Sequence, residues 1–115
     1  KRQNYNWAGY EATKQMVELV RRRFPEQLPF ALYGLMRSMI SLYDQALVTR
    51  SSKEQQWRRF AKDTQVFVRR NIGLVAESVD LPHGRSIQLK LMAISPVLYS
   101  VSFLIYKRIH PERSK

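Results

Sequence analysis

Residues 29–48 read PFALYGLMRSMISLYDQALV and carry a clear helical period. Apolar residues recur there at spacings of three and four, as they do along one face of an α-helix. These residues are Leu32, Leu35, Met36, Met39, Ile40, Leu42, Tyr43, Ala46 and Leu47. The stretch holds only two charged residues, Arg37 and Asp44, which a surface helix would rarely tolerate. We therefore expect it to be the most buried helix, at the centre of a bundle.

The segment before it predicts a first helix over residues 7–24. Proline disfavours the helical conformation of the residue before it, so Phe24-Pro25 should end this helix. The three arginines at residues 21–23 complement the negative end of the helix. The predicted buried face consists of Ala12, Met16, Leu19, Val20 and Phe24.

A third helix is predicted after the polar break that follows residue 48. Ser51 or Ser52, followed by Glu54 or Gln55, resembles a capping box, and the helix should end near Asn71. Its predicted apolar stripe comprises Trp57, Phe60, Ala61, Thr64, Phe67 and Val68.

The remaining chain predicts a connection and a last helical region. Residues 73–84 hold glycine and proline and are expected to form the connection. Ser86 is predicted to cap a helical region over residues 87–109, which Pro96 should kink or split because it has no N–H to donate. The expected fold is all-α, a small bundle of about four to five helices forming one domain over residues 1–115.

The composition limits the chemistry that the chain can perform. It has 115 residues and no cysteine, which excludes disulfides, thiolate metal sites and cysteine nucleophiles. Lys and Arg number 20 against 9 Asp and Glu, giving a net charge of +11. Such a charge indicates an anionic partner, such as nucleic acid, acidic lipid or a phosphorylated substrate.

No catalytic, cofactor-binding or metal-binding residue is predicted. The two histidines, His83 in a Pro-His-Gly turn and His110 near the end of the chain, have no evident orienting carboxylate. The acidic residues are scattered, with no HExxH, EF-hand or Asp-x-Asp pattern, and no glycine-rich loop could cradle a phosphate. By itself this chain is not expected to be an enzyme.

Residues 91–106 contain no charged side chain and are bracketed by basic residues. A membrane-spanning helix needs about 20 apolar residues, and this run is shorter and broken by Pro96. Two interpretations remain, a terminal helix buried in the core and a segment lying at an anionic membrane surface. The predicted membrane or partner contacts are Tyr99, Phe103, Leu104, Tyr106, Lys107 and Arg108.

A second predicted surface is formed by basic residues of the third helix. The predicted anion-binding residues are Arg58, Arg59, Lys62, Arg69 and Arg70. Nucleic acid is one partner that they would fit, through contacts to phosphates. No zinc-finger spacing, RNA-binding aromatic signature or basic leucine zipper accompanies them, so a solvated helix face is the simpler interpretation.

Two stretches resemble the C-terminal helical extension of bacterial family 2 glycosyltransferases, which build surface polysaccharides. The first is ELVRRRFPEQL at residues 18–28, followed by the long apolar helix. The second is KLMAISPVLY at residues 90–99, followed by YKR at residues 106–108. In such extensions an aromatic-Pro-Glu step precedes a buried helix, and a Ser-Pro, Leu-Tyr segment leads to an aromatic and basic end.

The resemblance implies that this chain is the C-terminal part of a longer protein. A nucleotide-sugar-binding catalytic domain with an Asp-x-Asp metal motif would then precede Lys1, and this part would be non-catalytic. It would pack on that domain, dock to the anionic inner face of the membrane, or do both, as a cytoplasmic, peripheral element without a cofactor. The alternatives are a nucleic-acid-binding module and a protein–protein adaptor, with self-association open.

Overall fold

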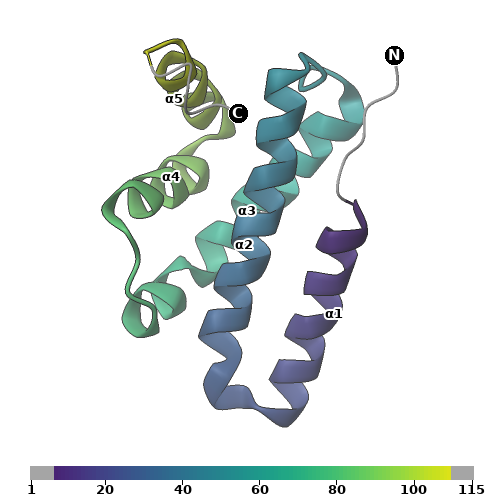
Figure 1. The fold of residues 1–115 in the computed structure, drawn as a ribbon, viewed down its shortest axis with the longest axis vertical. Coiled ribbons are helices and arrows are strands. Elements are labelled where there is room, and N and C mark those ends of the chain that lie inside the picture. The colour runs from purple at the N-terminus through teal and green to yellow at the C-terminus, as the bar shows by residue number, and fades with distance from the viewer. Residues whose placement is uncertain (1–6, 110–115) are drawn as a thin grey trace.

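A long apolar helix, α2 (Leu28–Val48), lies at the centre of the computed structural model, which describes residues 7–109 (Figure 1). The described residues contain helices and no strand, so the predicted all-α fold is confirmed. Around α2 the structure has α1 (Trp7–Arg23), a 3-10 turn (Pro25–Gln27), α3 (Gln55–Ser78), α4 (His83–Ile94) and α5 (Pro96–Ile109).

The helices pack in a simple order. α1 and α3 both lie against α2, α4 lies against α3, and α5 packs mainly on α4 with smaller contacts to α2 and α3. Figure 1 shows α5 at the opposite edge of the bundle from α1. Because α5 lies at this edge, one of its sides has no helix of residues 7–109 packed against it and is exposed to solvent.

The core is centred on α2, as its sequence predicts. All nine predicted positions of α2 are buried, and Met36 and Ala46 are fully excluded from solvent. The predicted stripe of α3 is also correct, because five of its six residues are buried and Phe67 packs partly buried against them. Burying a large aliphatic side chain contributes about 1.5–3 kcal/mol, so this helix pair supplies most of the hydrophobic stabilisation.

The predicted buried face of α1 is wrong, because the helix is rotated about its axis so that other residues face the core. Val17 is the buried residue of α1, whereas Met16 is 53% exposed and Phe24 is 52% exposed. The cause is an aromatic cluster: the Trp7 ring stacks on Trp57 with centroids 5.4 Å apart, and Tyr10 meets Phe60 edge-on. Such ring contacts stabilise one rotation of α1 over another that has the same apolar spacing.

The predicted boundaries of α3 and α4 also need correction. α3 continues through Gly73 to Ser78, because Val75 lies seven residues after Val68 on the same helix face and is fully buried. A glycine inside a helix costs about 1 kcal/mol, which the burial of Val75 offsets. The predicted capping box of α3 is not formed, because Glu54 precedes the helix without a side-chain cap.

The predicted cap of the last helical region is wrong as well. α4 begins at His83, so Ser86 lies inside the helix.

The predicted break at Pro96 is a split into two helices. Pro96 has no N–H for the α4 carbonyls, so α4 ends at Ile94 and Ser95 adopts an extended conformation. The Ser95 hydroxyl then accepts the Leu98 N–H at 3.3 Å, which caps the start of α5. Gln65 and Arg69 of α3 donate to carbonyls at the end of α4, so α3 holds the corner.

The rotation of α1 can be tested with two neighbouring substitutions. Val17→Ala should lower the free energy of unfolding by about 2 kcal/mol, because it leaves a cavity against α2. Met16→Ala should change it by less than about 0.5 kcal/mol, because the side chain is exposed. Urea denaturation followed by circular dichroism measures both values. The reverse ranking would show that α1 buries its predicted face.

Candidate membrane and anion-binding surface

One side of α5 is exposed and almost entirely apolar. Its aliphatic side chains are each between 48% and 71% exposed, an unusual density for a helix of 14 residues. We call this surface the outer face of α5, and it consists of Val97, Leu98, Val101, Leu104, Ile105 and Ile109. At 100° per residue these positions share one side of the helix, with Arg108 among them.

The opposite side of α5 attaches it to the bundle through a polar contact. Tyr99 is 1% exposed, and its hydroxyl donates a short hydrogen bond to the Asp44 carboxylate of α2. Between the adjacent residues of each helix, the hydroxyls of Tyr43 and Ser100 share a hydrogen bond of 3.1 Å. These two bonds join α5 to the C-terminal part of α2, so they help to set the orientation of its outer face.

Asp44 is the ionisable group of this contact, and its side chain is half-buried. Burial raises the pKa of its carboxyl from the ordinary value of 3.8 to about 7, although the Tyr99 hydrogen bond, Arg85 and Lys107 each act to lower it. Burial and the nearby Asp44 carboxylate also raise the pKa of the Tyr99 hydroxyl, which therefore stays protonated and donates. The carboxyl of Asp44 thus changes charge near neutral pH.

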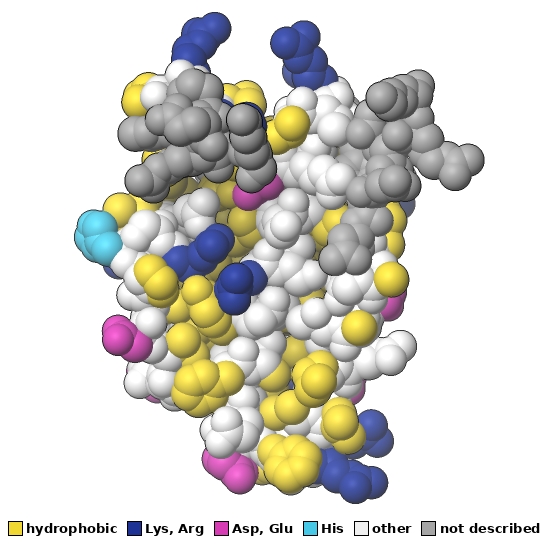
Figure 2. Space-filling view, in the orientation of Figure 1, with side chains coloured by type: hydrophobic (Ala, Val, Ile, Leu, Met, Phe, Trp, Pro, Cys, Tyr) yellow, Lys and Arg dark blue, Asp and Glu magenta, His cyan; other side chains and the backbone are white. Residues whose placement is uncertain are grey.

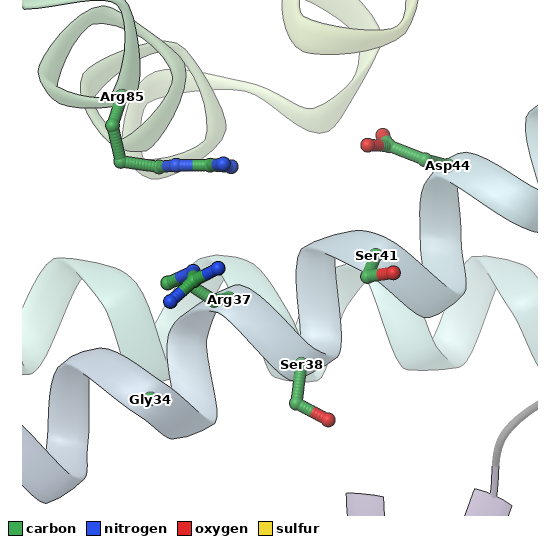
Figure 3. A pocket seen from close by; sticks show the side chains of 6 residues that line it. All are labelled: Gly34, Arg37, Ser38, Ser41, Asp44 and Arg85. Atoms are coloured by element: carbon green, nitrogen blue, oxygen red, sulfur yellow. The ribbon is translucent and has the colours of Figure 1, made fainter. Parts of the chain in front are cut away.

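A polar pocket of about 400 Å³ opens beside Asp44, between α2 and α4. We call it the arginine pocket, and it is lined by Gly34, Arg37, Ser38, Ser41, Asp44 and Arg85. Figure 3 shows Arg85 extending from α4 into the space above α2, where Asp44 points toward it and Ser38 points away. Figure 2 shows basic side chains gathered between α2 and α4 on this face.

Neither arginine of the pocket forms an ion pair with a described carboxylate at salt-bridge distance. Arg85 donates to the Gln88 side chain at 2.7 Å, and the guanidinium of Arg37 lies 5.8 Å from the centre of the Tyr33 ring. The salt bridge found within residues 7–109 joins Lys14 and Glu11 of α1, and neither residue lines this pocket. The guanidinium groups therefore keep donors for an anion.

A second, mostly apolar depression lies between α4 and α5. This α4–α5 groove has a volume of about 470 Å³. Its lining includes Ile87, Leu91, Phe103 and Tyr106, and it shares Arg85 with the arginine pocket. A charged pocket and an apolar groove therefore meet at one side chain.

The six residues predicted to contact a membrane or partner differ in their exposure to solvent. Leu104, Tyr106 and Arg108 are exposed, Phe103 and Lys107 are half-buried, and Tyr99 is buried. The sequence missed the other aliphatic residues of the outer face. Their spacing was visible in the sequence, but the side of α5 that packs inward depends on the Tyr99–Asp44 bond.

The five predicted anion-binding residues of α3 are all exposed. Helical spacing places them within about a third of the circumference, opposite the buried stripe. Arg69 has a structural role in addition, because its guanidinium donates two hydrogen bonds to the Ala93 carbonyl at the end of α4. The remaining four, Arg58, Arg59, Lys62 and Arg70, form a basic stripe along α3.

Neither a metal-binding cluster nor a membrane-spanning helix occurs in residues 7–109. No group of three or more metal-ligating side chains occurs in this range, and none of its helices is long and apolar enough to cross a bilayer. His83 is exposed at the start of α4, and His110 lies outside the described residues. Compared with protein-family models, curated proteins and solved structures, the chain gives no match.

The ionisation of Asp44 predicts a pH dependence of stability. Because its pKa is higher in the folded chain than in the unfolded chain, its contribution to stability is full below about pH 4 and is lost as the pH rises toward 7. Asp44→Asn keeps an oxygen for the Tyr99 hydroxyl and cannot ionise. Between pH 4.5 and 7.5 the variant should gain about 2 kcal/mol or more relative to the wild type.

Urea denaturation at the two pH values measures this gain. Asp63→Asn, at an exposed aspartate of α3, is the matched control and should show no such change. An equal difference between Asp44→Asn and wild type at both pH values would mean that Asp44 titrates like an exposed carboxyl.

Proposed function

We propose that this chain is a non-catalytic helical module that docks to an anionic membrane surface through the outer face of α5. The observation that carries the proposal is the set of six exposed aliphatic side chains on one side of that helix. The solvent-facing side of a helix in a water-soluble protein normally carries several charged residues. The outer face of α5 also faces solvent, but it carries a single charged residue, Arg108.

The charge of the chain favours a membrane over a second copy as the occupant. Two copies would each carry a net charge of +11 and repel one another, whereas acidic lipids attract this charge. Each basic residue near an anionic leaflet contributes about 1 kcal/mol. Lys107 and Arg108 lie in the last turn of α5, next to the apolar side chains that would enter the lipid.

The length of α5 fits a helix lying in the plane of the interface. Fourteen residues at about 1.5 Å each extend about 21 Å, less than the roughly 30 Å hydrocarbon core of a bilayer. An interfacial helix instead buries its apolar side at the boundary between headgroups and chains. The Tyr99–Asp44 bond would keep the helix body on the protein while the outer face enters the lipid.

The resemblance to glycosyltransferase extensions supplies the biological setting of the proposal. In a parent enzyme the module would hold an upstream catalytic domain at the cytoplasmic face of the inner membrane, where surface polysaccharides are assembled. Exposed apolar side chains of α1, among them Met16 and Leu19, offer a surface for that domain at the far edge of the bundle from α5. Sequencing the gene upstream of Lys1 tests this setting, which requires an α/β domain with an Asp-x-Asp motif.

Nucleic-acid binding is the second candidate, favoured by the basic stripe of α3. Four exposed basic residues on one helix face could contact consecutive phosphates. This function predicts oligonucleotide retention that falls steeply with salt and that Arg58→Ala with Arg59→Ala weakens for all sequences. Absence of retention at low salt would exclude it.

Membrane docking predicts a strong effect of two substitutions on the outer face. Leu104→Ser with Ile105→Ser should weaken binding to phosphatidylglycerol vesicles by about tenfold or more, because two aliphatic side chains no longer enter the lipid. Vesicle co-sedimentation measures the partition coefficient. The matched control is Met16→Ser with Leu19→Ser, which removes two exposed apolar side chains from α1.

The control variant should bind like the wild type. Equal loss in both variants would indicate general stickiness, and no vesicle binding by the wild type would refute membrane docking.

A further inference from the structure

The arginine pocket and the α4–α5 groove meet at Arg85, which lines both. We propose that together they bind one membrane lipid with a phosphate monoester headgroup, the phosphate in the pocket and a hydrocarbon chain in the groove. This inference rests on the proposed membrane docking, since it names the lipid that the docked module would select.

The pocket has the donors that a phosphate monoester requires. Arg37 and Arg85 come from different helices, α2 and α4, and line one space of about 400 Å³. Each guanidinium presents a planar fork of N–H donors that matches two phosphate oxygens. Ser41 adds a hydroxyl to the same lining. A monoester approaches a charge of −2 near neutral pH, which two guanidinium groups balance.

The floor of the pocket contains a glycine with open space above it. A Cβ atom built on Gly34 has no atom within 4 Å, so a side chain can be added at this position of the pocket lining without displacing a neighbour at Cβ. Leucine also has a higher helix propensity than glycine. Replacing Gly34 by leucine therefore fills the pocket while favouring the helix.

Asp44 is the one acidic group that lines the pocket. Its carboxyl accepts the Tyr99 hydrogen bond, and Arg85 and Lys107 lie near enough to act on its pKa. When ionised it repels a bound phosphate. Asp44→Asn should therefore strengthen phosphate binding, whereas removal of either arginine should weaken it.

The groove explains why a lipid is favoured over free phosphate. From Arg85 its lining continues over Ile87 and Leu91 of α4 and over Phe103 and Tyr106 of α5. Tyr106 is 46% exposed, and helical spacing places the groove-lining Ser102 between Tyr106 and the outer face. A chain leaving the arginine pocket would run along the apolar side chains of α4 and α5 in this groove and reach the outer face past Ser102.

The test compares two vesicle types of equal zeta potential, one with phosphatidic acid and one with phosphatidylglycerol, each in phosphatidylcholine. The headgroup of phosphatidic acid is a phosphate monoester, and that of phosphatidylglycerol is a diester. The wild type should prefer phosphatidic acid by about tenfold, because the arginine donors make charge-assisted hydrogen bonds to the monoester.

The variants separate selectivity from docking. Arg37→Gln, Arg85→Gln and Gly34→Leu should each abolish the preference and leave phosphatidylglycerol binding within about twofold. Arg58→Gln, which removes one exposed charge from α3, should leave the preference intact. A wild type without preference, or a preference that survives in both single-arginine variants, would overturn the proposal.

A soluble probe distinguishes failure of this site from failure of membrane docking. Hexyl phosphate, a monoester with a short chain, should shift the arginine Nε–Hε NMR signals of Arg37 and Arg85, with dimethyl phosphate, a diester, as the negative control. These shifts in a chain that binds no vesicles would support the pocket and refute docking. Absence of shifts would overturn the pocket, and equally tight binding of inorganic phosphate would overturn the assignment of a lipid.

Discussion

The missing N–H of Pro96 is the constraint on which the C-terminal half of this structure depends. Without it the apolar run of residues 91–106 cannot form one continuous helix, and the chain turns at Ser95. The carbonyls left at the end of α4 are satisfied by Gln65 and Arg69 of α3. The turn brings α5 back over α2 and leaves one of its sides in solvent.

The placement of α5 depends next on a polar group in an apolar helix. α2 buries ten residues, and next to one of them, Tyr43, it carries the half-buried Asp44, which α5 contacts. A buried carboxyl is tolerated when it is hydrogen-bonded, and Tyr99 supplies that bond. Together with the packing of Tyr99 and Phe103 against the core, this bond and its neighbour between Tyr43 and Ser100 set which side of α5 faces outward.

The same arrangement produces a surface with two chemical characters. The apolar outer face of α5 borders the α4–α5 groove at Ser102, and the groove extends to Arg85. There the arginine pocket begins, with guanidinium groups that no carboxylate of residues 7–109 pairs with at salt-bridge distance. An amphiphile would place its anionic head in the arginine pocket and its apolar chain in the groove. The net charge of +11 attracts such anionic molecules to the protein.

The sequence by itself determined the helical class, the burial of α2 and α3 and the break at Pro96. These follow from the spacing of apolar residues and from the covalent structure of proline, which are local properties. It also identified the apolar run of α5 as a surface of interest, but not the side that is exposed.

The tertiary structure decided the features that depend on distant residues. The contacts of α1 with the rings of Trp57 and Phe60 set the rotation of α1, and the burial of Val75 stabilises the continuation of α3 beyond Gly73. Arg37 and Arg85 are 48 positions apart in the sequence and meet because α4 packs beside α2 through α3. No spacing pattern encodes such a meeting, since it arises only when separate helices pack on a common core.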